Sequence, residues 1–293
     1  MSIRTVLVCG AGLMGHGVAQ VCAAAGCEVF VYEPDRARSE AGVARIAANL
    51  ERAVAKGRLE ADEREAILRR IRIADALNAA AAQADLAIEA IYEDEKAKHD
   101  LFRELGQRAQ PHTVLASNTS SISRTRLASA VHPDRRGRFI GMHFFSPVPV
   151  MPLIEITRGP ETTDEAEAEV RELAGRLGKQ VIVSRDRPGF IVNRILMPYL
   201  AEAMRGYDEG LGTPEDIDAG ARLGLSHPMG PLELADFIGL DVCLHVMQVL
   251  YDGFHAERFA PPPVLRQLVD AGYLGQKTGR GFYVYPREAT PES

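Results

Sequence analysis

Hydrophobic residues in the first part of the chain gather in short runs rich in β-branched side chains, and longer segments of mixed character separate these runs. The runs have the length of strands and the segments have the length of helices. This alternation predicts an α/β domain with a mostly parallel, doubly wound sheet and helices on both faces. The strand runs cover residues 4–9, 27–32, 84–90, 113–117, 138–144 and 180–184, and helix-length segments include 15–26, 35–70 and 93–109.

The segment from Asp35 to Arg70 is longer than a simple crossover between two strands requires. Gly57 interrupts its helical pattern. We therefore expect two helices that form a hairpin projecting from the sheet.

The pattern changes at Pro188, after which apolar residues recur at the three- and four-residue spacing of helices. Gly210 and Gly212 are typical of helix stops, and Thr213 followed by Pro214 is typical of a helix start. The helical segments are 189–210, 214–224, 230–253 and 261–272.

This change of pattern predicts two domains, and a chain of 293 residues is long enough for both. Residues 1–187 form the α/β domain, and residues 188–293 form an all-α domain. The apolar helices of the second domain carry more apolar surface than one buried face needs, which favours a homodimer through this domain.

Composition and charge narrow the class of partner. The chain is 46% hydrophobic and 25% charged, with a net charge of −6, which argues against a general nucleic-acid surface. No apolar run approaches the ~18 residues of a membrane span. The start, MSIRTVLVCG, enters a strand at once and leaves no room for a signal peptide. We expect a cytoplasmic protein with no nucleic-acid or membrane partner.

The four cysteines, Cys9, Cys22, Cys27 and Cys243, contain no C-x-x-C pair. Reduced thiols in the core of a cytoplasmic protein explain them better than metal ligands or a disulfide framework. No metal site is expected.

The stretch VLVCGAGLMGHG places Gly10, Gly12 and Gly15 in G-x-G-x-x-G spacing, with Leu13 and Met14 between them, after a strand and at the start of a helix. In this context the glycines allow a tight turn, the approach of a pyrophosphate and close helix–strand packing. The motif predicts a Rossmann-type dinucleotide site, and the alternative is a tight turn without a ligand.

Glu33 ends the second strand run. A carboxylate at this place accepts hydrogen bonds from the adenosine ribose hydroxyls and repels a 2′-phosphate, which favours NAD over NADP. Arg36 and Arg38 follow closely and weaken this inference. The alternative for Glu33 is a solvated charge at a strand end.

Small polar residues follow the strand run 113–117 in the stretch SNTSSIS, residues 117–123. The carboxyl ends of parallel strands are where such sheets bind ligands. A helix cap explains the same residues equally well.

The stretch GMHFFSPVPVMPLIEI places His143 and Glu155 on either side of a proline-rich turn. A histidine that accepts a proton benefits from a carboxylate on its other ring nitrogen, whereas His143 by itself fits a core histidine equally well. The turn folds one strand back toward the other, and RPGFIVNR then delivers Asn193 to the start of the second domain, where its amide is expected to reach the site.

In this order, these motifs are similar to those of the L-3-hydroxyacyl-CoA dehydrogenase family. The resemblance covers nearly the whole chain and extends through SHPMGPLELADFIGLD, residues 226–241, and KTGRGFYVY, residues 277–285, which are highly characteristic. It implies a two-domain NAD enzyme that is usually a homodimer through its helical C-terminal domain.

The resemblance also assigns catalytic roles residue by residue. It makes His143 the catalytic base and Glu155 its partner. Ser120 and Asn193 match the residues that orient the oxygen being oxidised, and Ser120 also belongs to the cofactor site.

The resemblance assigns binding roles in the same way. Glu93 and Lys98 match residues near the cofactor, Lys277 matches a cofactor-side lysine in the C-terminal tail, and Lys56 matches a lysine that contacts CoA.

Two positions depart from the family pattern. Ser146 stands where many members have the asparagine of H-F-F-N-P, which touches the nicotinamide side of NAD. Asn49 stands where the family has a second, serine contact to CoA. We expect Ser146 to contact the nicotinamide and Asn49 to contact CoA, although neither is the residue that the family usually has at that position.

We expect a reversible NAD-dependent dehydrogenase of (S)-3-hydroxyacyl-CoA, as in 3-hydroxybutyryl-CoA dehydrogenase, serving fatty-acid or butanoate metabolism. One alternative is a dehydrogenase of the same fold that acts on a non-CoA 3-hydroxy acid or a hydroxyacyl carrier protein. A protein that only binds NAD is the other alternative, and the Ser120, His143, Glu155 and Asn193 set argues against it because binding alone needs no histidine–glutamate pair.

Overall fold

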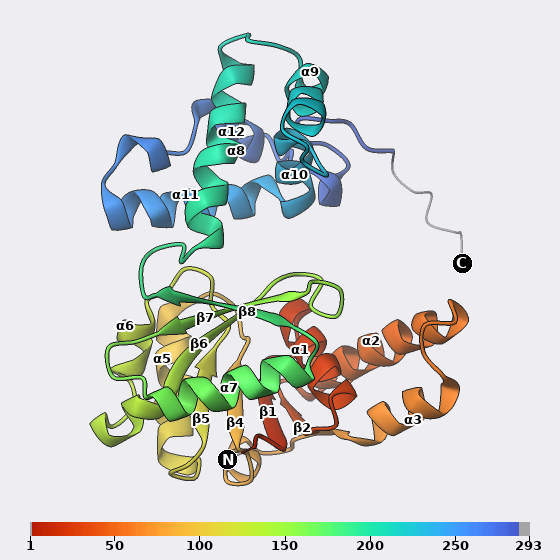
Figure 1. Ribbon diagram of the computed structural model, residues 1–293, viewed down its shortest axis with the longest axis vertical. Helices are drawn as coiled ribbons and strands as arrows, with labels where there is room; N and C mark the ends of the chain where they lie inside the picture. Colours follow the sequence, from red (N-terminus) through yellow and green to blue (C-terminus); the bar gives the residue numbers. More distant parts are fainter. Residues whose placement is uncertain (1, 287–293) are drawn as a thin grey trace. The chain divides into compact units, whose positions relative to one another are not determined.

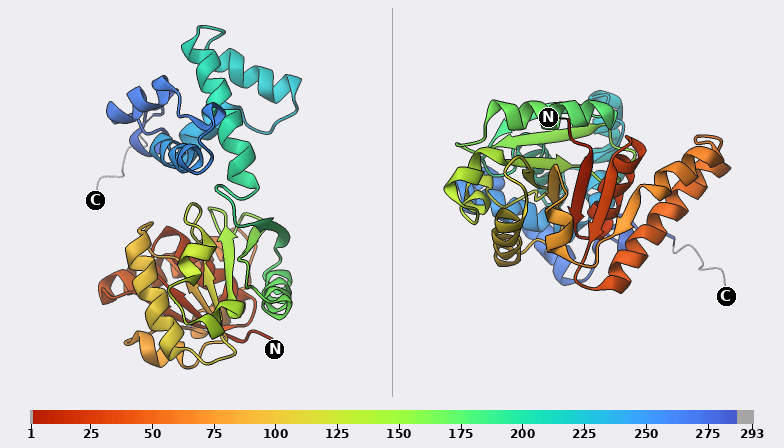
Figure 2. Two further views of the ribbon diagram at one scale, coloured as in Figure 1. Left: turned by 90° about the vertical axis from the view of Figure 1, so that its left-hand side faces the viewer. Right: turned by 90° about the horizontal axis from the view of Figure 1, so that it is seen from below.

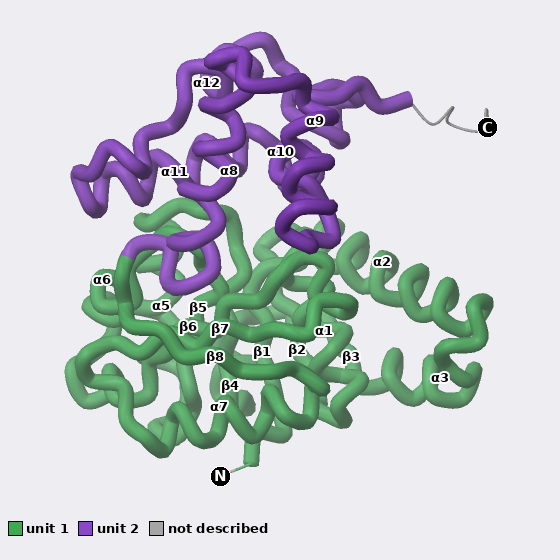
Figure 3. Tube along the Cα trace, turned by 45° about the horizontal axis from the view of Figure 1, so that its top comes forward, with its two compact units in different colours: residues 1–187 green, residues 188–293 purple. Residues whose placement is uncertain are grey.

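The computed structural model describes residues 2–286, and the chain divides into two compact units between Arg187 and Pro188 (Figure 3). The first unit is an α/β layer structure, and the second consists of helices.

An eight-stranded sheet forms the centre of the first unit, in the order β3-β2-β1-β4-β5-β6-β7-β8. All neighbouring pairs are parallel except β6 and β7. The predicted mostly parallel sheet is confirmed. The strands are β1 (Thr5–Cys9), β2 (Glu28–Tyr32), β3 (Ile71–Ile73), β4 (Leu86–Glu89), β5 (Val114–Ser117), β6 (Phe139–Phe144), β7 (Leu153–Arg158) and β8 (Gln180–Arg185).

Helices cover both faces of this sheet (Figures 1 and 2). Alternate residues of β1 enter two different cores: Val6 and Val8 pack with residues from α1, α2, α3 and α7, whereas Leu7 and Cys9 pack with residues from α4, α5 and α6. Burial on both faces explains why the strands read as nearly continuous hydrophobic runs. The helices are α1 (Leu13–Ala24), α2 (Arg36–Ala55), α3 (Ala61–Arg69), α4 (Leu77–Ala81), α5 (Glu95–Arg108), α6 (Arg124–Ala128) and α7 (Asp164–Arg176), with a 3₁₀ turn at Pro133–Arg138.

The predicted helical hairpin is formed by α2 and α3, which extend from one side of the sheet (Figure 2). Asp35 begins α2 by accepting a hydrogen bond from the Ala37 N–H at 3.0 Å. Gly57 follows the end of α2 with φ +63°, a conformation that favours glycine. The chain then re-enters a helix through a capping box between Glu60 and Glu63.

Two strands of the structure, β3 and β7, were not among the predicted strand runs. β3 has only three residues, too few to show a period. β7 is the returning strand that the proline-rich turn is expected to produce, and it pairs antiparallel with β6.

The second unit contains five α-helices among its described residues, 188–286. The segment 230–253 was expected to be helical throughout, but it forms two helices, α10 and α11, that are bent by 97°. Gly239 lies at the bend with φ +104°, a backbone conformation outside the helical region, so the apolar period continues while the helix axis does not. The elements are α8 (Val192–Asp208), α9 (Pro214–Ala219), a π turn (Gly220–Gly224), α10 (Pro231–Ile238), α11 (Leu240–Phe254), α12 (Pro263–Asp270) and 3₁₀ turns at Glu257–Phe259 and Gln276–Thr278.

Within residues 2–286, no single helix has the length and apolar character of a membrane span, and only the bent pair α10 and α11 meets that test when its two helices are counted together. The four cysteines are buried and unpaired, as the sequence predicts.

A buried aspartate connects three segments of the second unit. Asp218 in α9 is fully buried and accepts hydrogen bonds from the N–H groups of Leu232 and Glu233, at 2.8 and 2.9 Å, in the first turn of α10. The hydroxyl of Tyr283, in the C-terminal segment, donates to the same carboxylate at 2.8 Å. Asp218 therefore caps α10 and also anchors the C-terminal segment.

Replacing Asp218 by alanine is expected to lower the free energy of unfolding by about 2–4 kcal/mol, because two buried backbone N–H groups lose their acceptor. Urea titration followed by circular dichroism measures this change. Asp252→Ala removes an exposed aspartate from the same unit and should change the free energy by about 0.5 kcal/mol or less. Equal effects of the two substitutions would show that Asp218 is not an anchor.

Candidate active site

The glycine turn joins β1 to α1. Gly10 has φ +106°, and a Cβ atom there would lie 2.4 Å from the Ala90 carbonyl oxygen. A Cβ atom at Gly15 would lie 1.8 Å from the Gly10 carbonyl oxygen, whereas one at Gly12 would meet no atom within 4 Å. Gly10 and Gly15 are thus required by packing, and Gly12 leaves open space beside the N-terminus of α1, where a pyrophosphate binds in such folds.

A cavity of ≈ 700 Å³ opens beside this turn. The turn residues 10–14, including Leu13 and Met14, line its base, Glu33 lies at the end of β2, and α2 and α5 contribute its two sides. The Glu33 carboxylate accepts a hydrogen bond from the Ala11 N–H at 3.3 Å. The volume and the carboxylate fit the adenosine half of a dinucleotide.

The arginines after Glu33 point to different places. Arg36 pairs with Glu40 at 3.0 Å and with Asp75, whereas Arg38 lines the cavity. Arg45, which is not among the predicted site residues, also lines the cavity. Its spacing of seven residues from Arg38 places both side chains on one face of α2, and this was the available signal.

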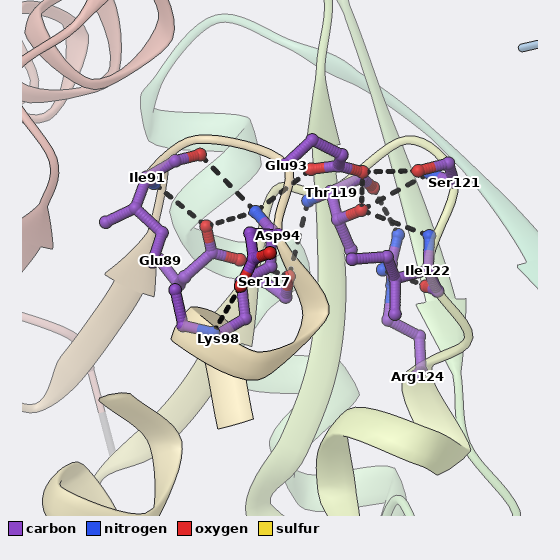
Figure 4. Close-up of polar contacts among 11 residues, drawn as sticks. Glu89, Ile91, Glu93, Asp94, Lys98, Ser117, Thr119, Ser121, Ile122 and Arg124 are labelled. Carbon is purple, nitrogen blue, oxygen red and sulfur yellow. Dashed lines mark hydrogen bonds and ion pairs between the residues drawn. The ribbon is translucent and has the colours of Figure 1, made fainter. Parts of the chain in front are cut away.

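A buried ion pair lies where β4 and β5 end (Figure 4). The Lys98 ammonium, on α5, is 2.5 Å from a carboxylate oxygen of Glu89 and 3.0 Å from one of Glu93. The side chains of Lys98 and Glu89 are 1% and 0% exposed. Glu89 also accepts hydrogen bonds from the Ser117 hydroxyl at 2.6 Å and from the Ile91 N–H at 2.9 Å. One carboxylate therefore connects β4, β5 and α5.

Glu93 connects this pair to the loop that follows β5 (Figure 4). Its carboxylate accepts hydrogen bonds from the hydroxyls of Ser121, at 2.5 Å, and Thr119. Burial alone would raise the pKa of Glu93, but Lys98 and the two hydroxyls lower that pKa to about 2. Glu93 therefore carries a full negative charge at neutral pH.

Ser120 lies between these two hydroxyl residues and is half-buried. Asn118, in the same loop, accepts a hydrogen bond from the Phe144 N–H at 2.9 Å. The loop that carries Ser120 is thereby attached to the end of β6.

His143 and Glu155 are direct partners across the antiparallel pair β6 and β7. The His143 Nδ1 atom is 3.4 Å from a Glu155 carboxylate oxygen, and the two side chains are 9% and 0% exposed. The His143 ring also packs against the Phe145 ring, with centroids 4.6 Å apart. A carboxylate at Nδ1 can hold the ring and stabilise its protonated form, which leaves proton transfer to Nε2.

Ser146 lies two residues after the end of β6 and is exposed. The turn is held by Lys179, whose ammonium donates to the carbonyls of Val148 and Met151 at 2.7 and 2.6 Å. These bonds fix the return of the chain into β7, and hence the register that pairs His143 with Glu155.

The two residues matched to CoA contacts lie on or next to α2. Asn49 donates to Gln20 of α1 at 3.2 Å and accepts from Arg52 at 2.5 Å. Lys56 caps the C-terminal end of the helix and is exposed. Both residues are separate from the Glu89 and Glu93 network.

Two predicted site residues belong to the second unit. Asn193 lies in the first turn of α8, and the Lys277 ammonium is 2.5 Å from an Asp241 carboxylate oxygen. Their approach to the residues of the first unit stays a prediction.

Family models match almost the entire chain. The model described as 3-hydroxyacyl-CoA dehydrogenase, NAD binding domain, matches residues 5–187. The model described as 3-hydroxyacyl-CoA dehydrogenase, C-terminal domain, matches residues 189–285.

Individual relatives agree with these models. The chain is 48% identical to the 3-hydroxybutyryl-CoA dehydrogenase of Bradyrhizobium diazoefficiens over 289 residues, which cover 99% of this chain and 97% of the relative. The solved structure of (S)-3-hydroxybutyryl-CoA dehydrogenase from Ralstonia eutropha has a TM-score of 0.93 at 45% identity and covers 98% of this chain and 100% of that one. A solved diketoreductase has a TM-score of 0.85 at 31% identity, covering 97% and 100%.

These matches confirm three predictions from the sequence: the family resemblance, the fold class and NAD as the cofactor. With both of its units matched and relatives aligned over nearly their full lengths, the chain belongs to the 3-hydroxyacyl-CoA dehydrogenase family.

Proposed function

We propose that the protein catalyses the reversible NAD-dependent oxidation of (S)-3-hydroxyacyl-CoA to 3-ketoacyl-CoA, with 3-hydroxybutyryl-CoA as its reference substrate. The observation that carries this proposal is the buried contact between His143 and Glu155 in a dinucleotide-binding sheet. Bound NAD⁺ would supply the hydride acceptor for the oxidation at C3 of the substrate.

In this mechanism His143 removes the proton of the C3 hydroxyl through Nε2. Glu155, at Nδ1, orients the ring and stabilises the imidazolium that forms. Ser120 and Asn193 orient the C3 oxygen. In the reverse direction, the protonated His143 is the acid, and proton transfer by such a group typically accelerates a reaction ~10²–10⁴-fold.

The glycine turn and Glu33 hold the adenosine and pyrophosphate parts of the cofactor in this proposal. On the nicotinamide side we assign Glu93, Lys98 and Ser146 from the first unit and Lys277 from the second. The ionised state of Glu93 supports its assignment, because its carboxylate accepts hydrogen bonds and donates none.

Asn49 and Lys56 are assigned to CoA. Lys56 is exposed, which makes its charge accessible to a phosphate. The alternative substrate is a 3-hydroxy acid without CoA or a hydroxyacyl carrier protein. A diketoreductase with a similar structure is described as acting on dicarbonyl compounds. This similarity supports the alternative that the substrate carries no CoA.

Formation of NADH from NAD⁺ and (S)-3-hydroxybutyryl-CoA tests the proposal. Activity with the thioester and none with free 3-hydroxybutyrate supports it. Activity with the free acid alone would establish the alternative substrate class, and NADH binding without turnover of either compound would indicate a protein that only binds NAD. A series of C4 to C16 thioesters then separates a role in butanoate metabolism from one in longer fatty-acid metabolism.

We place the protein in the cytoplasm. Four buried, unpaired cysteines support this proposal, because thiols stay reduced in that compartment. Fractionation of cells that produce the full chain would test it.

His143→Gln should lower kcat by ~10²-fold or more while NAD still binds, because glutamine cannot act as the base. Glu155→Gln preserves the shape of the side chain but removes the charge that supports the imidazolium, so its loss should also appear mainly in kcat. The double variant should be little slower than the slower single variant, since the two groups act as a unit.

A double-mutant cycle on kcat, with thermal melts to confirm folding, measures this coupling. Additive losses, or full turnover by Glu155→Gln, would mean that Glu155 is only a strand residue.

Wild-type enzyme should use NAD⁺ at least about tenfold better than NADP⁺ in kcat/KM, because Glu33 repels a 2′-phosphate. Glu33→Ala should narrow this gap, since Arg38 and Arg45 line the same cavity. Arg36→Ala is the matched control, and it should leave the ratio unchanged because Arg36 pairs with Glu40 and Asp75. Equal use of both cofactors by the wild-type enzyme would contradict the assignment of Glu33.

We also propose that the protein is a homodimer through its second unit. Large apolar side chains are exposed on the surface of that unit, and a second copy would cover them. The most exposed are Ile195, Leu211, Leu223, Leu225 and Val284. Light scattering at micromolar concentration should give twice the chain mass, and Leu223→Lys should shift the protein toward monomer. A wild-type monomer would contradict the proposal.

A further inference from the structure

Arg124 is a fully buried arginine beneath the loop that carries Ser120. Its guanidinium donates hydrogen bonds to the carbonyl oxygens of Thr119 and of Ile122, the latter at 2.8 Å (Figure 4). These two carbonyls lie on either side of Ser120 and Ser121. These two hydrogen bonds therefore link the two ends of the loop and fix the backbone on both sides of Ser120.

The same side chain also reaches β6. A Cβ atom at Gly141 would lie 2.3 Å from Nε of Arg124 and 3.0 Å from its Cδ. The arginine thus crosses β6 at a residue without a side chain, two residues before His143. It is in contact with both the Ser120 loop and the strand that positions the histidine.

Four carboxylates act on this buried charge: those of Asp186, Glu93, Glu89 and Glu155. Burial lowers the pKa of Arg124 to about 10, so the guanidinium stays protonated at neutral pH. Glu155 is the partner of His143, and Glu93 holds the hydroxyls of the Ser120 loop.

Asp186 strengthens the attachment of this region. Its carboxylate accepts hydrogen bonds from the Arg124 N–H at 3.0 Å, from the Ser123 hydroxyl at 2.7 Å, and from the N–H and hydroxyl of Thr125 at 2.9 and 2.8 Å. The start of α6 is therefore fixed to the end of β8, and the arginine side chain extends from a rigid base.

A buried charge is not needed to fill this space. Apolar side chains of similar volume commonly replace buried ionic groups with no loss of stability. A charge at this place needs another explanation, and the groups that surround it are those of the proposed reaction.

We propose that Arg124 is a positioning residue for the dehydrogenase reaction. It fixes the backbone around Ser120 and balances the negative charge of Glu155 and Glu93, so that the hydroxyl of Ser120 and the ring of His143 keep one arrangement during turnover. This inference rests on the proposed function, because it concerns the residues assigned to the substrate oxygen and the proton.

The test compares Arg124→Met with wild-type enzyme. Methionine keeps an unbranched side chain but removes the charge and both donors. We expect kcat with NAD⁺ and (S)-3-hydroxybutyryl-CoA to fall about tenfold to a hundredfold, the range expected when reacting groups are misplaced by about 1 Å. The KM for each substrate and the Kd of NADH from fluorescence titration should change less than about threefold, because the nucleotide cavity and α2 contain no part of Arg124.

Arg126→Met is the matched control. Arg126 is on the same helix, is 68% exposed and pairs with Glu95 at 2.8 Å. A surface pair contributes little, so kcat should stay within about twofold of wild type. Arg124→Lys keeps the charge but cannot hold two carbonyls with the same fork, and kcat should fall between those of wild type and Arg124→Met.

The outcomes separate the two proposals. A wild-type enzyme without activity on the thioester removes the proposed function, and the inference with it. An active wild type with unchanged kcat in folded Arg124→Met, or with an increase confined to KM, overturns the inference alone. If Arg124→Met does not fold, Arg124→Lys decides: a lower kcat with unchanged NADH affinity supports the inference, and a wild-type kcat overturns it.

Discussion

The ammonium group of Lys98 lies between the carboxylates of Glu89 and Glu93, and the arrangement of the site depends on this buried contact. Removing an ammonium or a carboxylate from water is strongly unfavourable unless opposite charges and hydrogen bonds compensate it. Glu89 meets that requirement through Lys98, Ser117 and the backbone of Ile91. Because these partners come from three elements, the ends of β4 and β5 and the first turns of α5 cannot move independently without exposing a buried charge.

The proposed catalytic pair depends on a different constraint, the reversal of direction between β6 and β7. A parallel strand needs a long crossover, whereas an antiparallel strand returns through a short turn. The short return brings a residue twelve positions further along the chain opposite His143, and the register makes that residue Glu155. A slip of one residue would turn the carboxylate to the other face of the sheet. The bonds from Lys179 to the turn therefore bear directly on the geometry of His143.

Elements with a local signal can be predicted from the sequence. The turn between β1 and α1 and the hairpin of α2 and α3 are each defined by residues close together in the chain. Glu89 and Arg124 were missed for a physical reason: a charged residue at the end of an apolar strand or at a helix start is usually solvated, and only long-range partners show that it is buried. The bend at Gly239 was missed because apolar spacing continues through it.

The burial of all four cysteines has a practical consequence for studying this protein in solution. Cys9, Cys22, Cys27 and Cys243 are each 1% exposed or less, and burial raises the pKa of their thiols, so they react slowly with alkylating reagents. A cysteine introduced on the surface of each unit would therefore accept a spin label or a fluorophore without removal of the native thiols. Distances between such a pair of labels would report how the two units are arranged in solution and whether that arrangement changes when cofactor and substrate are added.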